Sequence, residues 1–217
     1  MRSGLTPNNR TESLIEALPY IQKFRGQTFV IKYGGSAMED DQQVDRLLRD
    51  VVFLEAVGIN PVLVHGGGKA ISARMREAGI VPEFVNGLRV TDGESVRIVE
   101  DILDGVINPA IVETIARHGG SATGISGKRT FRAERLEPVV LERGKAVDIG
   151  YVGSATDVEV VEVRRAVDSE RVPVISPIGA DEGGQVLNIN ADVAAAALAS
   201  ELRAQKLIFV SDVPGIM

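Results

Sequence analysis

The sequence predicts an α/β protein, a three-layer αβα sandwich with a mainly parallel central sheet and a β-hairpin insertion. Short apolar runs alternate with stretches of helical spacing between about residues 28 and 210. Two of these runs, at residues 29–31 and 62–64, are each followed by glycines and then by a helical stretch. This order is typical of βα units, which place strands side by side and helices on both faces.

The predicted elements follow in chain order. After about ten disordered residues, a helix starts at Thr11 or Ser13, carries apolar residues on one face and bends at Pro19. A strand at 28–31, a helix around 44–54 ended by Gly58, a strand at 62–64 and a helix at 69–78 come next.

The second half of the chain repeats the alternation. Apolar spacing predicts helices around 98–103 and 111–115, a strand at 172–178, a helix at 191–202 and a last strand at 207–210. The stretch from 130 to about 158 has short apolar pieces separated by glycine and charged residues. That pattern predicts an antiparallel β-hairpin inserted between the parallel units.

The composition excludes several classes of protein. The chain has 217 residues, a net charge of -6, no cysteine and 2 histidines. Disulfides, thiolate metal sites and histidine-rich metal sites are therefore excluded. No basic stripe and no apolar run of membrane-spanning length occurs, and the N-terminus lacks a signal peptide. We expect a cytoplasmic protein without nucleic-acid or membrane partners.

Lysine and glycine residues at the ends of two strands predict an anion site. Lys32 precedes Gly34 and Gly35, and His65 precedes the glycines at 66–68. Without Cβ atoms, backbone N–H groups can approach an anion closely, and the lysine adds positive charge. Neither run has the spacing of a P-loop or of a dinucleotide-binding loop. The alternatives are two tight turns and a lysine that reaches solvent.

Other polar residues have a structural and a functional interpretation. Arg89 is either a surface arginine or a guanidinium that pairs with a carboxylate. Asn190 is a predicted helix N-cap and Asp192 suits the first turn of that helix, but capping does not explain Asn188. Both histidines, at 65 and 118, are interpreted as structural.

In chain order, these motifs resemble those of the N-acetylglutamate kinases, which belong to the amino acid kinase superfamily. The motifs are Lys32-Tyr33-Gly34-Gly35-Ser36-Ala37-Met38, His65-Gly66-Gly67-Gly68, Asn86-Gly87-Leu88-Arg89-Val90-Thr91, Asn188-Ile189-Asn190-Ala191-Asp192 and Ser211-Asp212-Val213-Pro214-Gly215-Ile216. The first two alone would also match carbamate, aspartate and glutamate 5-kinases. The segment at 86–91 narrows the resemblance to the acetylglutamate enzymes.

The resemblance implies the amino acid kinase fold and an ATP-dependent phosphorylation of the γ-carboxylate of N-acetyl-L-glutamate, in arginine biosynthesis. The implied sites are catalytic Lys32 and Asp192; phosphoryl-binding Gly34, Gly35 and Gly67; substrate-binding Gly67, Gly68, Arg89 and Asn188; and ATP-binding Asp212, Val213, Pro214, Gly215, Ile216 and Met217. Mg²⁺ would come mainly with the nucleotide, without a dedicated protein site. A γ-carboxylate, with a reference pKa of about 4.3, is already ionised, which explains the lack of an obvious general base.

The resemblance also implies a domain organisation and partners. Residues 1–26 would form an extension helix, 27–203 the acetylglutamate-binding and dimerisation domain, and 204–217 the start of an ATP-binding domain, which makes the chain the N-terminal portion of a longer protein. The extension resembles that of the hexameric branch of the family, which L-arginine inhibits. The alternative is that this helix packs on its own domain and that the protein is a dimer. The rival functions are phosphorylation of aspartate, glutamate or carbamate, and a fragment that binds acetylglutamate without turnover.

Overall fold

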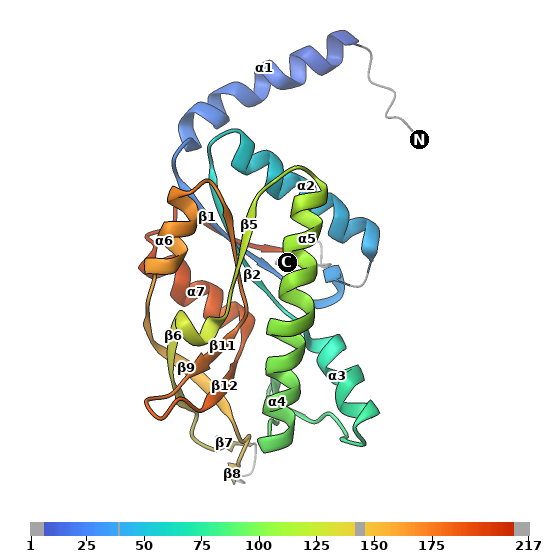
Figure 1. The fold of residues 1–217 in the computed structure, drawn as a ribbon, viewed down its shortest axis with the longest axis vertical. Helices are drawn as coiled ribbons and strands as arrows, with labels where there is room; N and C mark the ends of the chain where they lie inside the picture. Colours follow the sequence, from blue (N-terminus) through green and yellow to red (C-terminus); the bar gives the residue numbers. More distant parts are fainter. Residues whose placement is uncertain (1–6, 39, 142–145, 211–217) are drawn as a thin grey trace.

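The central layer of the molecule is a five-stranded parallel sheet. The computed structural model describes residues 7–38, 40–141 and 146–210. The strand order is β13-β1-β2-β10-β5, and every neighbouring pair is parallel (Figure 1). The strands are β1 (Thr28–Tyr33), β2 (Asn60–His65), β5 (Ala122–Ile125), β10 (Val172–Ile175) and β13 (Lys206–Val210). The predicted α/β class with a parallel central sheet is confirmed.

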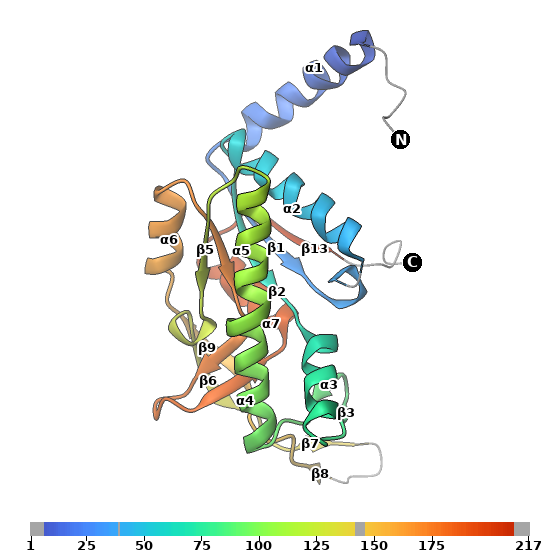
Figure 2. The same cartoon turned by 45° about the vertical axis from the view of Figure 1, so that its right-hand side comes forward.

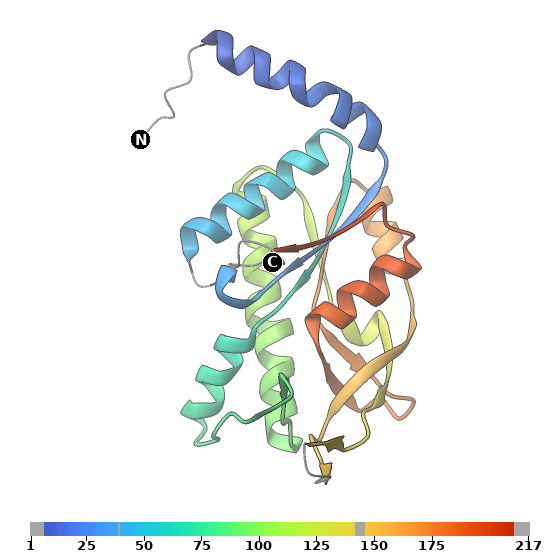
Figure 3. The same cartoon turned by 180° about the vertical axis from the view of Figure 1, so that it is seen from behind.

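Helices cover both faces of this sheet. Helices α2 (Asp41–Ala56) and α5 (Asn108–Arg117) pack on one face, and α6 (Val161–Asp168) and α7 (Ala191–Glu201) on the other (Figures 1 and 3). Successive strand residues pack into two different apolar cores. Ile31 and Leu63 face the first pair of helices, whereas Val30 and Val62 face the second. Because both faces are covered, the strands are apolar throughout rather than alternating.

The N-terminal helix begins earlier than the sequence predicts. Helix α1 (Pro7–Phe24) includes residues 7–10, which the sequence analysis assigns to a disordered segment, and Pro19 lies inside it. The start expected at Thr11 or Ser13 is therefore wrong. Figures 1 and 2 show α1 projecting from the body of the molecule, so the alternative that it packs along its own domain is also wrong.

The two helices expected around 98–103 and 111–115 form one continuous helical rod. Helix α4 (Gly93–Ile102) runs through the π-helical segment η2 (Leu103–Ile107) into α5 (Figure 2). The Asn108 N–H donates to Leu103 O, five residues back, and Pro109, which has no N–H to offer, follows in the first turn of α5. A wide turn therefore accommodates the proline where a separate helix start was expected.

A second, smaller sheet closes on itself. Strands β6 (Phe131–Arg135), β9 (Val152–Val158), β12 (Val186–Ile189) and β11 (Ile178–Ala180) form a four-stranded barrel. The antiparallel pairing of β6 with β9 agrees with the predicted hairpin, and the short strands β7 (Val139–Val140) and β8 (Ala146–Val147) pair between them. The single strand expected at 172–178 is wrong, because Ser176 and Pro177 divide it into β10 and β11, which lie in different sheets.

The remaining elements are short or lie around the cavity described below. They are η1 (Gly35–Met38), α3 (Gly68–Glu77), β3 (Phe84–Val85), β4 (Leu88–Arg89) and η3 (Gly127–Arg129). No helix within the described ranges is long and apolar enough to cross a membrane. The cytoplasmic location and the domain boundaries at residues 26 and 203 stay predictions.

Candidate functional site

The two glycine loops lie side by side at the carboxyl ends of β1 and β2. The parallel register pairs Tyr33 with His65, so both loops begin at the same level of the sheet. The Gly66 N–H donates to Tyr33 O at 2.7 Å, and a Cβ added to Gly66 would lie 3.2 Å from the Gly34 Cα. A side chain on Gly66 would therefore press on the backbone of the neighbouring loop, and glycine lets the two loops approach this closely.

A cavity of about 500 Å³ opens between these loops, β4, β12 and the N-terminus of α7. Its lining includes seven of the residues that the sequence analysis selects: Lys32, Gly35, Gly67, Gly68, Arg89, Asn188 and Asp192. The eighth, Gly34, lies behind the lysine, since a Cβ there would be 3.1 Å from the Lys32 Cε. Residues Asp212, Val213, Pro214, Gly215, Ile216 and Met217, the expected start of the ATP site, lie outside the described residues.

Lys32 turns into the cavity instead of reaching solvent. Its side chain is 16% exposed, and its Nζ forms an ion pair with Asp192 Oδ1 at 3.0 Å. Lys32 comes from the end of β1 and Asp192 from the first turn of α7, so the pair joins two elements that are far apart in sequence. A carboxylate at a helix N-terminus is stabilised by the helix dipole, and the ion pair in turn orients the Lys32 ammonium.

Arg89 is a buried residue, so the alternative of a surface arginine is wrong. It is 6% exposed, and its NH2 group donates to Gly68 O at 2.7 Å and to Ser72 Oγ at 2.8 Å. The guanidinium carbon lies 4.6 Å from the centroid of the Phe84 ring. Burial, with a smaller contribution from the charge of Arg76, lowers the pKa of Arg89 below its usual value. A cation held in this way is ready to receive an anion.

Asn188 and Asn190 are oriented by different contacts. Asn190 caps α7, since its side-chain oxygen accepts from the N–H groups of Asp192 at 2.9 Å and Val193 at 3.2 Å. Asn188 instead donates from Nδ2 to Thr91 Oγ1 at 3.3 Å. The Thr91 hydroxyl donates in turn to Arg89 O at 2.8 Å, so the amide of Asn188 is tied to the strand that carries Arg89.

Several contributors to the cavity have no signal in the sequence. Ser72 and Phe84 line it and fix the Arg89 side chain, and Met75 Sδ accepts from Arg89 NH1 at 3.2 Å. Ser72 and Met75 lie on α3 at a helical spacing that any packed helix would show. Their role depends on how α3 lies against β4, which the spacing does not reveal.

Within the described ranges, no group of three or more His, Cys, Asp or Glu side chains is arranged to hold a metal ion. The cavity offers the ion-paired ammonium of Lys32, the side chain of Lys69, the guanidinium of Arg89 and the N–H groups of two glycine loops. This donor set suits a ligand with a carboxylate at one end and a phosphoryl group at the other.

Comparison with known proteins gives a consistent family assignment. A model of the amino acid kinase family matches residues 27–217. The chain is 49% identical over 205 residues to the acetylglutamate kinase of Akkermansia muciniphila, covering 94% of this chain and 69% of that protein. It is 47% identical over 213 residues to the acetylglutamate kinase of Methanocaldococcus jannaschii, covering 96% and 71%.

Solved structures agree with this similarity. N-acetylglutamate synthase from Neisseria gonorrhoeae, complexed with coenzyme A and N-acetyl-glutamate, superposes with a TM-score of 0.80 at 25% identity, covering 95% of this chain and 46% of that one. The protein smu.665 from Streptococcus mutans UA159 superposes with a TM-score of 0.76 at 29% identity, covering 88% and 74%. The chain thus spans about 70% of the kinases' length and less than half of the synthase.

Proposed function

The chain belongs to the amino acid kinase family, and within it to the acetylglutamate kinases, and we propose that it phosphorylates the γ-carboxylate of N-acetyl-L-glutamate with ATP, in arginine biosynthesis. The observation that carries this proposal is the shared cavity of Lys32 and Arg89, with the two glycine loops between them. One cation is suited to the transferring phosphoryl group and the other to the α-carboxylate of the substrate.

The chemistry needs no proton transfer. The ionised γ-carboxylate attacks the γ-phosphorus of ATP, the new O–P bond forms, and ADP leaves with the electron pair of the broken bond. The product is an acyl phosphate. Catalysis then depends on in-line positioning and on neutralising the charge of the transferring group. In our proposal Lys32 and the N–H groups of Gly35 and Gly67 supply that neutralisation.

At the substrate end of the cavity, Arg89 offers a donor and Asn188 an acceptor for the substrate. The Arg89 Nε–H has no partner among the described residues and remains for the α-carboxylate. Because the Nδ2 of Asn188 already donates to Thr91, its Oδ1 is left to accept from the amide N–H of the acetylated substrate. An unacetylated amine carries a positive charge instead, so the cavity distinguishes the two substrates by charge and size.

Asp192 orients Lys32 through their ion pair in this proposal. Mg²⁺, which the kinase family typically uses, supplies additional positive charge on the phosphates. In our proposal the nucleotide carries this ion through its phosphates.

A substrate panel tests the proposal. The purified full-length protein is incubated with ATP, Mg²⁺ and, in turn, acetylglutamate, glutamate, aspartate or carbamate, and the acyl phosphate is trapped with hydroxylamine. We expect turnover with acetylglutamate alone. Turnover of another amino acid but not of acetylglutamate rejects the proposal in favour of a different amino acid kinase. Calorimetric binding of acetylglutamate with neither ATP binding nor product supports the binding-fragment alternative.

Lys32→Ala tests the assignment of the lysine. We expect kcat to fall by about a hundredfold or more while the Kd for acetylglutamate stays within about twofold, because Lys32 acts on the phosphoryl group. Lys128→Ala is the matched control, since Lys128 pairs with Glu100 and does not line the cavity. Equal rates in the Lys32→Ala and Lys128→Ala chains would show that the role given to Lys32 is wrong.

We also propose self-association and feedback inhibition. Helix α1 projects from the body and exposes Ile15 and Leu18, one helical turn apart. A second copy of α1 would cover these residues and join dimers into a hexamer. L-arginine is the inhibitor we propose for such an assembly.

A further inference from the structure

A chain of buried polar groups lies directly behind the second glycine loop. His65 and Asn108 are 0% and 5% exposed, and neither lines the cavity. Asn108 Nδ2 donates to Val174 O at 2.9 Å and lies 3.2 Å from His65 Nε2. His65 Nδ1 lies 3.0 Å from Gly66 O. Because an unpaired polar group at such depth is costly, these contacts fix how each group is turned.

The amide of Asn108 determines which nitrogen of His65 carries the proton. The Val174 carbonyl can only accept, so it faces the amino group of Asn108 and not its amide oxygen. The second hydrogen of the same amino group points at His65 Nε2, which must therefore be the bare nitrogen. The proton lies on Nδ1, which donates to Gly66 O. Burial lowers the pKa of His65 to about 4, in agreement with a neutral ring.

This hydrogen bond sets the direction of the next backbone N–H. No peptide bond in the described ranges is cis, so the Gly67 N–H points opposite to the Gly66 carbonyl. The carbonyl faces the buried ring, and the N–H therefore faces the side on which Gly67 lines the cavity. Among the described groups the Gly67 N–H has no acceptor, which leaves it for an anion.

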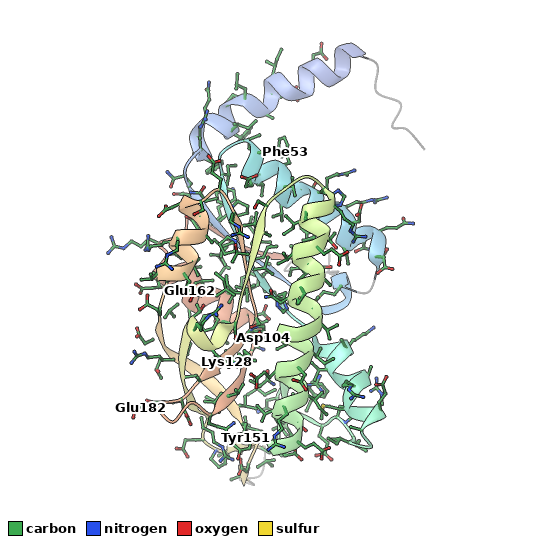
Figure 4. The ribbon with its side chains drawn as sticks, viewed as in Figure 1. Phe53, Asp104, Lys128, Tyr151, Glu162 and Glu182 are labelled. Atoms are coloured by element: carbon green, nitrogen blue, oxygen red, sulfur yellow. The ribbon has the colours of Figure 1, made fainter. Side chains whose placement is uncertain are left out.

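Two neighbouring features keep Asn108 in place. A Cβ added to Gly124 would lie 2.2 Å from Asn108 Oδ1, so glycine is the residue that leaves room for the amide. One turn before Asn108, Asp104 accepts from Ser176 Oγ at 2.5 Å, which ties the π-helical segment to the connection between β10 and β11. Figure 4 labels Asp104 on this central helical rod.

We propose that Asn108 and His65 are positioning residues of the phosphoryl site: Asn108 holds His65 in the Nδ1–H tautomer, and His65 turns the Gly66–Gly67 peptide so that the Gly67 N–H faces the transferring phosphoryl group. The identity of that anion rests on the proposed function. Neither side chain touches the reacting atoms. A carbonyl that accepts a hydrogen bond also polarises its own peptide, which makes the Gly67 N–H a stronger donor.

The tautomer is measured directly, without any assay of activity. The full chain is labelled with ¹⁵N-histidine, and the ring nitrogens are observed by NMR near neutral pH. His118→Gln removes the other histidine and assigns the signals. We expect a protonated Nδ1 and a bare Nε2 at His65. A protonated Nε2 with a bare Nδ1 would overturn the proposal.

Asn108→Leu tests the part given to Asn108. The side chain keeps a similar length but cannot donate to Nε2, so we expect the Nε2–H tautomer of His65 to gain population relative to the wild-type chain, although Gly66 O still accepts from Nδ1. If His65 stays entirely in the Nδ1–H form in this variant, Asn108 does not select the tautomer and its role is refuted.

Inorganic phosphate is the probe for the Gly67 N–H. The backbone amide signal of Gly67 is followed during a phosphate titration of the wild-type, His65→Phe, His65→Asn and His118→Phe chains. We expect His65→Phe to weaken phosphate binding about tenfold, with acetylglutamate binding within about twofold of wild type. Asn, whose amide can donate to Gly66 O, should recover part of the loss, and His118→Phe should match wild type.

Two outcomes of the titration would refute the role of His65. They are equal phosphate affinity in the wild-type and His65→Phe chains, and a wild-type Gly67 signal that phosphate does not move. If the proposed function is wrong, the substrate panel shows no phosphorylation of acetylglutamate. The two NMR measurements do not depend on that reaction, so they still test the roles of Asn108 and His65.

Discussion

Arg89 illustrates how this cavity prepares a single residue for its ligand. Its NH2 group donates to Gly68 O and Ser72 Oγ, its NH1 group donates to Met75 Sδ, and its face packs over Phe84. These contacts stop the guanidinium from rotating, so little further entropy is lost when a carboxylate binds. A lysine at this position would keep the charge but not the planar array of donors.

We therefore expect Arg89→Lys to weaken binding of N-acetyl-L-glutamate by about thirtyfold, equivalent to about 2 kcal/mol. Calorimetry measures the Kd. Arg76→Lys, on the exposed side of α3, is the control and should change little. 4-Acetamidobutyrate, which lacks the α-carboxylate, should be affected far less by Arg89→Lys. Equal losses for both ligands would contradict the pairing of Arg89 with the α-carboxylate.

His65 makes stability depend on pH. Burial lowers the pKa of its folded form to about 4 from the usual 6.5, so the unfolded chain takes up a proton first as pH falls. The stabilisation is fully present above pH 6.5 and is lost as pH falls toward 4. By linkage the loss is about 1.4 kcal/mol per pH unit at most, or about 2 kcal/mol between about pH 6.5 and pH 5.

Urea unfolding at a series of pH values measures this effect. His65→Asn should flatten the slope of the wild-type chain over the same interval. A wild-type profile that is flat between about pH 6.5 and pH 5 would rule out a buried neutral His65.

At the residue scale, the sequence predicts the groups that carry charge better than the groups that hold them. Lys32 and Arg89 stand out because charged side chains are unusual beside buried strands. Asp192 is an ordinary residue for a first helical turn, and its role appears only with its ion pair to Lys32. Ser72, Met75 and Thr91 do not stand out either, since each is an ordinary residue whose partner lies in another element. His65 is interpreted as structural from the sequence, but its contacts with Asn108 and Gly66 appear only when β2 lies beside α5.

At the scale of elements, the π-helical segment η2 determines what the second glycine loop can contain. A Cβ on Gly67 would lie 2.6 Å from Leu103 Cδ2 and 2.7 Å from Ile107 Cδ1, and both side chains are buried. Gly67 has an extended φ of -175°, so backbone strain plays no part. The requirement for glycine here is purely one of space.

Gly67→Ala should consequently cost about 1–3 kcal/mol of unfolding free energy, because the methyl group overpacks the contact with η2. Gly105→Ala is the matched control within η2 itself. A Cβ added at Gly105 meets nothing within 4 Å, so this substitution should be neutral or slightly stabilising. Chemical denaturation compares the two. If Gly67→Ala is as stable as Gly105→Ala, the loop is not held against η2 as described.

Element boundaries depart from the sequence prediction where tertiary pairing overrides local pattern. The apolar run at 172–178 looks like one strand, but Ser176 donates to Asp104 and Pro177 O accepts from Ile189 N, so the run turns from the parallel sheet into the barrel. The rod of α4, η2 and α5 looks like two helices because Pro109 interrupts the pattern. Long-range partners decide both cases, and they leave no local signal.

At the scale of the whole molecule, the site forms because parallel strands end at one edge. The glycine loops after β1 and β2 meet there, and the N-terminus of α7 arrives beside them from a distant part of the chain. The order of βα units predicted from the sequence was sufficient to place the two glycine loops at the same edge of the sheet. The barrel was not predicted, because its closure pairs β12 with β9 and β11 with β6 across long sequence separations.

Helix α1 stands apart from this body, and its deletion tests what it is for. Its described contacts with the core lie at its C-terminal end, where the Phe24 ring packs edge-on against Phe29 at 5.3 Å and the Lys206 ammonium lies 4.7 Å from the Phe24 centroid. A chain of residues 27–217 should therefore keep its fold and nearly all of its thermal stability. Since α1 carries the exposed Ile15 and Leu18, we expect the same chain to lose the larger assembly and sediment as a dimer or smaller species.

Leu18→Glu should have the same effect on mass without removing the helix, because a charge cannot be buried unpaired in an apolar contact. Glu16→Lys, on the opposite side of α1, is the control and should leave the mass unchanged. Sedimentation gives the size of each species, and thermal shifts with L-arginine show whether the response to the inhibitor depends on the assembly. Unchanged mass and an unchanged arginine response in both the 27–217 and Leu18→Glu chains would exclude α1 as the contact between subunits.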